Sequence, residues 1–216
     1  MLHGPLLCNW FSCGPQLCSL PRKSNSAKVP IKMPRAEIRA KSLLVLGGAR
    51  SGKSRYAQRL AETCGLEPVL IATAEARDAE MALRIKRHMA GRGGQWAVFE
   101  EPVALVEALW REARKDRIVV VDCTTLWLSN LMLGDDDVAA ATQRLALSVA
   151  KLSGPVIFVS NEVGGGVVPQ NDVARAFRDA QGVLNQALAE ACEAVVLISA
   201  GIAIMLKPSP EPVFRF

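Results

Sequence analysis

Short apolar runs alternate with amphipathic stretches along most of the chain, beginning near residue 41. Runs of four or five apolar residues predict strands at residues 43–46, 69–72, 96–99, 118–121, 156–159, 195–198 and 202–206. Apolar residues at helical spacing between these runs predict helices at residues 53–64, 78–90, 102–114, 124–133, 137–152 and 172–192. This alternation indicates βαβ units, and therefore an α/β fold in which a mostly parallel sheet is flanked by helices.

Residues with special backbone or capping preferences mark several of these boundaries. Gly65 follows the first predicted helix, at the position where a left-handed backbone favours glycine. Pro102 lies where the first turn of the third helix is expected, because a residue there needs no N–H donor. Asp137 precedes the fifth helix and is predicted to cap it.

The first 40 residues differ from the rest of the chain in pattern and in charge. They contain five prolines and no regular periodicity, which predicts an irregular basic tail before a single domain at residues 41–216. Residues 1–41 hold seven Lys or Arg and one acidic residue, so they account for more than the whole net charge of +5. The near-neutral domain argues against a nucleic-acid-binding face. Other interpretations of the tail are a translation start near Met33 or a targeting peptide, but it lacks a secretory signal pattern.

The composition predicts a soluble cytoplasmic protein. Every apolar run falls short of the 18 or more residues that a membrane-spanning helix needs. Cys64, Cys123 and Cys192 fall in or next to predicted helices and strands, where we expect small buried hydrophobic residues in a reducing compartment. The other three cysteines lie in the tail and match no established zinc-ligand spacing.

An eight-residue segment between the first predicted strand and the first predicted helix matches the P-loop pattern G-x-x-x-x-G-K-[ST]. The segment reads Gly47-Gly48-Ala49-Arg50-Ser51-Gly52-Lys53-Ser54. Its glycines allow backbone N–H groups to converge on phosphate oxygens, and the helix N-terminus adds partial positive charge. Lys53 is expected to contact the β- and γ-phosphates, and Ser54 to hold Mg²⁺. The segment therefore predicts binding of a nucleoside triphosphate.

Asp122 follows the four apolar residues 118–121 of a predicted buried strand. A carboxylate at the end of a strand downstream of a P-loop usually lies near the Mg²⁺ ion. The same residue also suits the N-cap of the helix expected from Thr124 onward. Both interpretations are open from the sequence, and they are compatible with each other.

His88 is one of two histidines in the chain, and the other lies in the tail. Arg84, His88 and Arg92 are spaced four apart, so they form one stripe if the second predicted helix continues to Arg92. A histidine nitrogen can attack phosphorus, and neighbouring guanidinium groups would neutralise the charge that develops on phosphoryl oxygens. A solvated charged helix face explains the same stripe about as well.

Several motifs together resemble those of the bifunctional adenosylcobinamide kinase/adenosylcobinamide-phosphate guanylyltransferase family. Besides the P-loop extended through Arg55, the matching segments are Ile71-Ala72-Thr73-Ala74, Arg84-Ile85-x-x-His88-x-x-x-Arg92, Val121-Asp122-Cys123-x-Thr125-Leu126-Trp127, Ser160-Asn161-Glu162-Val163-Gly164, Val168-Pro169-x-Asn171 and Phe177-Arg178-Asp179. They occur in order across residues 43 to about 207, so only the tail lies outside the resemblance.

The resemblance implies two reactions of late cobalamin biosynthesis. In the first, ATP or GTP phosphorylates the aminopropanol hydroxyl of adenosylcobinamide. In the second, GMP passes from GTP to that phosphate by way of a guanylylated histidine, and His88 occupies the position of this histidine. The family also implies a homo-oligomer, a trimer, with sites between subunits. The expected cofactor is the Mg²⁺ that the P-loop pattern assigns to Ser54 and Asp122.

The resemblance also implies a set of nucleotide-binding residues. These are Gly47, Gly48, Ala49, Arg50, Ser51, Gly52, Lys53, Ser54, Ala72, Thr73, Ala74, Met89, Ala90, Gly91, Arg92, Glu100 and Asp122. Glu100 rests on a short aligned stretch, and a solvated surface acid is the other interpretation of that residue.

Three further residues are candidates for contact with the corrinoid substrate. Glu162 follows a predicted strand and could accept the proton of the substrate hydroxyl, although it suits a loop-stabilising carboxylate equally well. Arg175 and Arg178 begin the long helix and could contact a corrinoid phosphate, whereas surface ion pairs explain them at least as well. Two rival functions stay open: a kinase in which His88 is structural, and a nucleotide-gated binding protein without a small-molecule acceptor.

Overall fold

The computed structural model describes residues 39–75 and 96–209, and all of them belong to one unit of the chain, Ile38–Phe216. The predicted tail lies almost entirely outside the described residues, so its separation from the domain stays a prediction. The predicted helix at residues 78–90 lies outside them as well, together with His88.

The described residues alternate between strands and helices, as the hydrophobic pattern predicts. The strands are β1 (Ser42–Leu46), β2 (Glu67–Ala72), β3 (Ala97–Glu100), β4 (Arg117–Asp122), β5 (Val156–Val159), β6 (Ala194–Ser199) and β7 (Ile202–Lys207). The helices are α1 (Lys53–Thr63), α3 (Leu105–Glu112), α4 (Thr124–Leu133), α5 (Val138–Val149) and α6 (Asp172–Ala191).

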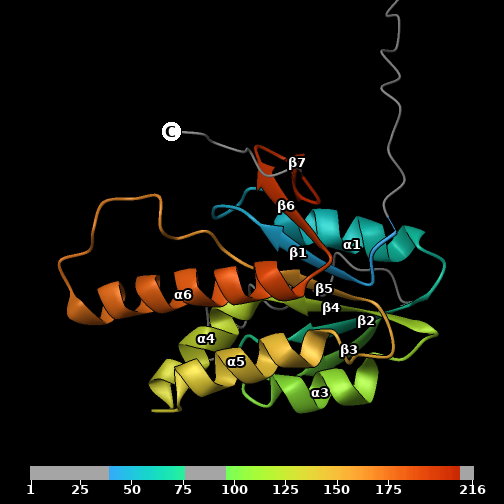
Figure 1. Cartoon of the computed structure of the whole chain (residues 1–216), viewed down its shortest axis with the longest axis horizontal. Helices are drawn as coiled ribbons and strands as arrows, with labels where there is room; N and C mark the ends of the chain where they lie inside the picture. The colour runs from blue at the N-terminus through green and yellow to red at the C-terminus, as the bar shows by residue number, and fades with distance from the viewer. Residues whose placement is uncertain (1–38, 76–95, 210–216) are drawn as a thin grey trace, which may run out of the picture. The chain divides into compact units, whose positions relative to one another are not determined.

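The seven strands form one sheet in the order β3-β2-β4-β5-β1-β6-β7. The first six are parallel to their neighbours, and only β7, at one edge, runs antiparallel to β6. The expected P-loop α/β class is therefore confirmed. β5 lies between β1 and β4, so the carboxyl ends of these three strands are neighbours at one edge of the sheet (Figure 1).

Side chains that alternate along the strands pack into two separate hydrophobic cores, one on each face of the sheet. Leu44, Val121 and Phe158 point toward α3, α4, α5 and α6, and are packed with Trp127 and Leu184 from those helices. The opposite core contains Val45, Val120 and Ile157 with residues of α1, the one described helix on that face. Both faces of the sheet are thus covered, which is why the central strands are apolar throughout.

Most predicted element boundaries agree with the structure. Gly65 follows α1 with a φ of +82°, and the Asp137 side chain caps α5 by accepting from the Ala140 N–H at 3.0 Å. The prediction for Pro102 was wrong, because α3 begins at Leu105. The Glu101 carboxylate accepts from the N–H groups of Val103 and Ala104 and so stabilises a separate turn before the helix.

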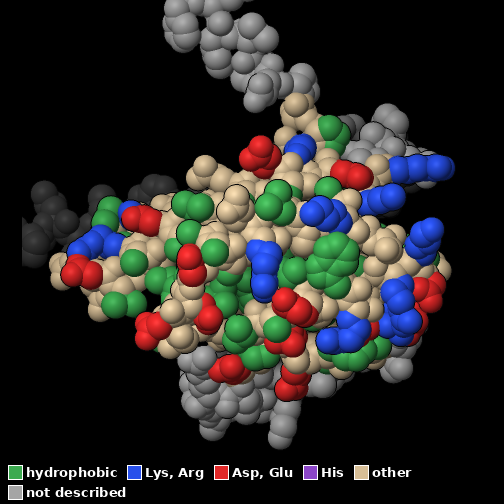
Figure 2. Space-filling view, turned by 60° about the horizontal axis from the view of Figure 1, so that its bottom comes forward, with side chains coloured by type: hydrophobic (Ala, Val, Ile, Leu, Met, Phe, Trp, Pro, Cys, Tyr) green, Lys and Arg blue, Asp and Glu red, His purple; other side chains and the backbone are tan. Residues whose placement is uncertain are grey.

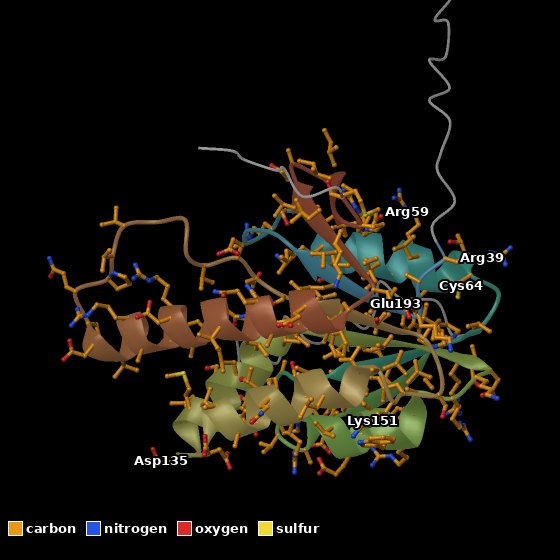
Figure 3. All side chains as sticks on the ribbon, viewed as in Figure 1. Arg39, Arg59, Cys64, Asp135, Lys151 and Glu193 are labelled. Carbon is orange, nitrogen blue, oxygen red and sulfur yellow. The ribbon has the colours of Figure 1, made fainter. Side chains whose placement is uncertain are left out.

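The cysteines agree with the prediction in two cases out of three. Cys123 and Cys192 are buried. Cys64 is exposed, contrary to expectation, and it is the C-cap residue at the end of α1 (Figure 3).

The surface over α3 and α5 carries charges of both signs between apolar side chains, and no single-sign basic area covers it (Figure 2). Within residues 39–75 and 96–209, no helix is long and apolar enough to cross a membrane.

Candidate active site

The P-loop connects the carboxyl end of β1 to the start of α1 and adopts backbone angles that explain its glycines. Gly47 has a φ of +150°, and a Cβ atom there would lie 2.4 Å from the carbonyl oxygen of Ile198. Gly52 has a φ of +101°. Side chains at these two positions would be strained or would collide with backbone, so the loop can fold in this form only with glycine.

The first turn of α1 is open to an anion. Its N-cap is Gly52, no side chain caps it, and its first turn contains no acidic residue. The first N–H groups of a helix have no partner within the helix, and the helix dipole makes this end partly positive. In addition, Ser51 Oγ is buried without a hydrogen-bond partner in the described part of the chain. These features suit the phosphate oxygens that the P-loop pattern predicts.

Lys53 lies at the base of the loop and is only 6% exposed. Its Nζ donates to the carbonyl oxygen of Gly48 at 2.7 Å, so the ammonium group lies across the loop. Burial lowers the pKa of Lys53 below its ordinary value, while nearby Cys123 and Asp122 oppose the shift. A partly desolvated cation held against the loop is suited to bind the negative oxygens of a nucleotide phosphate.

Ser54 and Asp122 meet although they lie far apart in the sequence. Ser54 Oγ donates to Asp122 Oδ1 at 3.3 Å, which joins the first turn of α1 to the end of β4. Asp122 is not the N-cap of α4, since that position is held by Cys123. A hydroxyl and a carboxylate side by side are the oxygen ligands that Mg²⁺ takes from a protein when phosphates supply others. The residues present therefore fit the ion that the P-loop implies.

Thr73 is fully buried and holds the end of β4 in place. Its hydroxyl donates to the Cys123 carbonyl at 2.6 Å and accepts from the Cys123 N–H at 2.9 Å. Its own carbonyl accepts from Asn130 Nδ2 at 2.8 Å. Since these polar groups are engaged within the protein, the Thr73 side chain positions Asp122 through its neighbour Cys123. The peptide bond between Asp122 and Cys123 is cis.

Glu162 lies beside the P-loop at the end of β5. Its backbone N–H donates to the Gly47 carbonyl at 2.9 Å. Its exposed side chain accepts from the Gly164 N–H at 3.0 Å, which is the loop-stabilising contact considered from the sequence. A carboxylate has capacity for more than one hydrogen bond, so this contact leaves room for a second partner.

Glu100, Arg175 and Arg178 lie away from this centre or have local partners. Glu100 ends β3, four strands from β1, which places it about 19 Å away at the usual strand spacing. Arg175 donates to the carbonyl groups of Pro169 and Gln170 and pairs with Asp172. Arg178 pairs with Asp179 at 3.2 Å.

The segment with His88 and residues 89–92 lies outside the described residues, so its predicted part in the site stays a prediction. The structure does describe where this segment departs from the sheet. Ala74 and Glu75 follow β2 at the same edge as the P-loop, and β2 pairs directly with β4 and so lies next to Asp122.

Two polar residues near the site were missed by the sequence reasoning. They are Gln181 and Asn185, which lie buried with Ser160 and Thr125 of the matching motifs at the end of β5. One signal was available: Gln181 and Asn185 lie four residues apart on the same helix face as Leu184 and Leu188, where an apolar core residue is expected.

Comparison with known proteins shows which family this chain belongs to. The family model described as cobinamide kinase / cobinamide phosphate guanyltransferase matches residues 43–206. The bifunctional adenosylcobalamin biosynthesis protein CobP of Pseudomonas aeruginosa is 49% identical over 169 residues, which cover 77% of this chain and 98% of that relative. The bifunctional CobU proteins of Escherichia coli and Salmonella typhimurium are each 36% identical over 180 residues, covering 76% of this chain and 99% of each relative. This chain therefore belongs to the cobinamide kinase / cobinamide phosphate guanyltransferase family.

Proposed function

We propose that this protein is a bifunctional transferase of cobalamin biosynthesis. It phosphorylates adenosylcobinamide with ATP or GTP, and it then transfers GMP from GTP to adenosylcobinamide phosphate, releasing pyrophosphate. The observation that carries the proposal is the extent of the family match, which spans both the P-loop and the segment with His88.

In the kinase step, the P-loop amides and Lys53 bind the triphosphate and stabilise the charge that develops on the transferred group. Ser54 and Asp122 would hold Mg²⁺, which when bound neutralises negative charge on the β- and γ-phosphates. The substrate hydroxyl oxygen bonds to the γ-phosphorus, the bond from γ-phosphorus to the bridging oxygen breaks, and a nucleoside diphosphate leaves. Glu162 accepts the hydroxyl proton.

In the guanylyl step, the attack is at the α-phosphorus and needs a nucleophile from another element. An imidazole nitrogen of His88 bonds to the α-phosphorus of GTP, and pyrophosphate leaves. A phosphate oxygen of adenosylcobinamide phosphate then attacks the same phosphorus, and the bond to the imidazole breaks. The described residues before the His88 segment support this assignment, because Ala74 and Glu75 follow the end of β2, which pairs with β4 at Asp122.

Glu100 is suited to the nucleoside end of GTP. It ends β3, four strands from the P-loop strand and two strands, roughly 10 Å, from Asp122, which suits a part of the nucleotide beyond the phosphates. A carboxylate there would accept hydrogen bonds from the N1–H and N2 amino group of guanine, which adenine lacks. We expect Glu100 to favour GTP in the guanylyl step.

The remaining assignments follow the family resemblance. Met89 to Arg92 would complete the nucleotide site, and Arg175 and Arg178 would bind a corrinoid phosphate after exchanging their local partners. We expect a cytoplasmic homotrimer.

Labelling with α-³²P GTP tests the proposal directly. The wild-type protein should acquire an acid-labile label, and His88→Ala should abolish the label while retaining phosphorylation of adenosylcobinamide. His3→Ala is the matched control, because His3 is the other histidine of the chain and should keep the label. An unlabelled wild type that still phosphorylates adenosylcobinamide would favour the kinase-only function. Triphosphate binding without either product would favour the nucleotide-gated binding protein.

A further inference from the structure

A cluster of three buried polar side chains lies directly behind the end of β5. Ser160 and Gln181 are fully buried, and Asn185 is 6% exposed. Ser160 Oγ donates to Asn185 Oδ1 at 2.6 Å, and Gln181 Nε2 donates to both Ser160 Oγ and Asn185 Oδ1 at 3.0 Å. The three side chains therefore form a closed ring of hydrogen bonds between β5 and α6.

The cluster is an exception on its helix face. Leu184 and Leu188 of α6 are fully buried in the hydrophobic core, and leucine at positions 181 and 185 would continue that packing. Instead, the face carries two amides, and Gln181 Oε1 is buried with no partner in the described part of the chain. Buried polar groups cost stability unless they are paired, so the unpaired Gln181 Oε1 carries a cost that leucine at this position would avoid.

The cluster continues into the backbone that follows β5. Asn185 Nδ2 donates to the Asn161 carbonyl at 3.0 Å, and the Asn161 N–H donates to Thr125 Oγ1 at 2.9 Å. The next residue, Glu162, donates its N–H to Gly47 of the P-loop. Side chains from α4 and α6 thus fix one residue of the chain, and that residue immediately precedes Glu162.

We propose that Ser160, Gln181 and Asn185 are positioning residues for the kinase step, which act by fixing Asn161 and thereby holding the Glu162 carboxylate beside the P-loop. This inference rests on the proposed function, in which Glu162 accepts the hydroxyl proton. A base displaced by about 1 Å can cost on the order of 100-fold in rate, so the strand end needs a rigid anchor.

The inference predicts that the two reactions of this protein differ in their dependence on the cluster. Phosphorylation of adenosylcobinamide removes a proton from a neutral hydroxyl, so it needs a positioned base. Guanylyl transfer is an attack by an imidazole nitrogen and then by an already ionised phosphate, so it needs no proton acceptor at Glu162. The second activity therefore provides an internal control for intact folding and nucleotide binding.

The test uses full-length Asn185→Leu and Gln181→Met, which keep side-chain size and remove the amide. With saturating ATP and adenosylcobinamide, we expect the kinase kcat to fall roughly 10- to 100-fold while KM for ATP changes little. With GTP and adenosylcobinamide phosphate, we expect guanylyl transfer to stay within about threefold of wild type.

Leu188→Val is the matched control, since it weakens packing one turn further along α6 without changing the cluster. If Asn185→Leu does not fold, Thr125→Val replaces it in the same assays, because it removes a single hydroxyl that is bonded to Asn161.

A double-mutant cycle separates positioning from a general structural effect. Glu162→Gln alone should lower the kinase kcat roughly 100-fold or more. If the cluster acts through Glu162, adding Asn185→Leu to Glu162→Gln should lower kcat by less than about threefold further. The inference would be overturned if the two substitutions lowered kcat by the product of their separate effects. An equal loss of both activities in Asn185→Leu would overturn it as well. A wild type lacking one of the two activities would instead overturn the proposed function, so the two failures are distinguishable.

Discussion

Replacing Thr73 by valine removes the one hydroxyl that bonds both backbone groups of Cys123, with almost no change in side-chain shape. The Thr73 hydroxyl donates to the Cys123 carbonyl at 2.6 Å and accepts from the Cys123 N–H at 2.9 Å. The carbonyl keeps a second donor, the Trp127 N–H at 3.2 Å. Among the described residues, the Cys123 N–H bonds only to Thr73, and the substitution would leave this buried donor without that partner.

The cost follows from these two bonds. Each net hydrogen bond contributes about 0.5–1.5 kcal/mol, and a buried donor left without a partner costs about 1–3 kcal/mol. We therefore expect Thr73→Val to lower the free energy of unfolding by about 2–4 kcal/mol, which lowers Tm by about 5–15 °C for a domain of this size. Since Cys123 adjoins Asp122, the Mg²⁺ concentration that gives half-maximal kinase activity should rise as well.

Thermal unfolding followed by circular dichroism measures the first effect, and a Mg²⁺ titration of kinase activity measures the second. Thr73→Ser is the matched control, because it keeps the hydroxyl and loses one buried methyl group, a cost of about 1 kcal/mol. If Thr73→Val unfolds at the same temperature as Thr73→Ser and needs no more Mg²⁺, the hydroxyl does not hold the end of β4 and the argument is refuted.

Three further predictions concern the P-loop and the thiols. Lys53→Met should lower the kinase kcat roughly 100- to 1,000-fold, and because burial lowers the pKa of Lys53, the alkaline limb of the wild-type kcat/KM profile should lie below pH 10.5. A profile that stays flat to that pH would contradict this assignment. Asp122→Asn should raise the Mg²⁺ requirement about tenfold or more, and unchanged Mg²⁺ dependence would remove Asp122 from the metal site. Burial raises the pKa of the Cys123 and Cys192 thiols to about 11 and about 12, so iodoacetamide at pH 8 should modify Cys64 and leave both unmodified, as read by peptide mass mapping.

The elements of this fold could be predicted because their signals are local. Each central strand is a short apolar run, and periodicity placed most boundaries within one or two residues. The start of α3 was misplaced because Pro102 is compatible with both a helix start and a turn. The Glu101 side chain decides between them by bonding the next N–H groups, and no spacing rule encodes that choice.

The strand order is not a local property, and it determines which residues become neighbours. Alternation predicts a parallel sheet, but not that β5 lies between β1 and β4. This order brings Glu162, three residues after β5, against Gly47 and leaves Glu100 at the far edge. From sequence alone, Glu100 and Glu162 were both acidic residues near strand ends. The structure separates them, because Glu162 lies beside the P-loop and Glu100 ends the edge strand β3.

The buried polar residues were missed for a different reason, which also explains why they matter. An amphipathic pattern assigns polar residues of a helix to solvent, so Gln181 and Asn185 count as interruptions of the apolar face of α6. In the structure Asn185 bonds the backbone beyond β5, as Thr73 bonds the backbone beyond β4, and Gln181 bonds the Asn185 side chain. The strand ends that carry Asp122 and Glu162 are thus each held by a side chain from another element. A motif match interprets such residues as ligand contacts. Their hydrogen bonds indicate instead that they position the groups that contact the ligand.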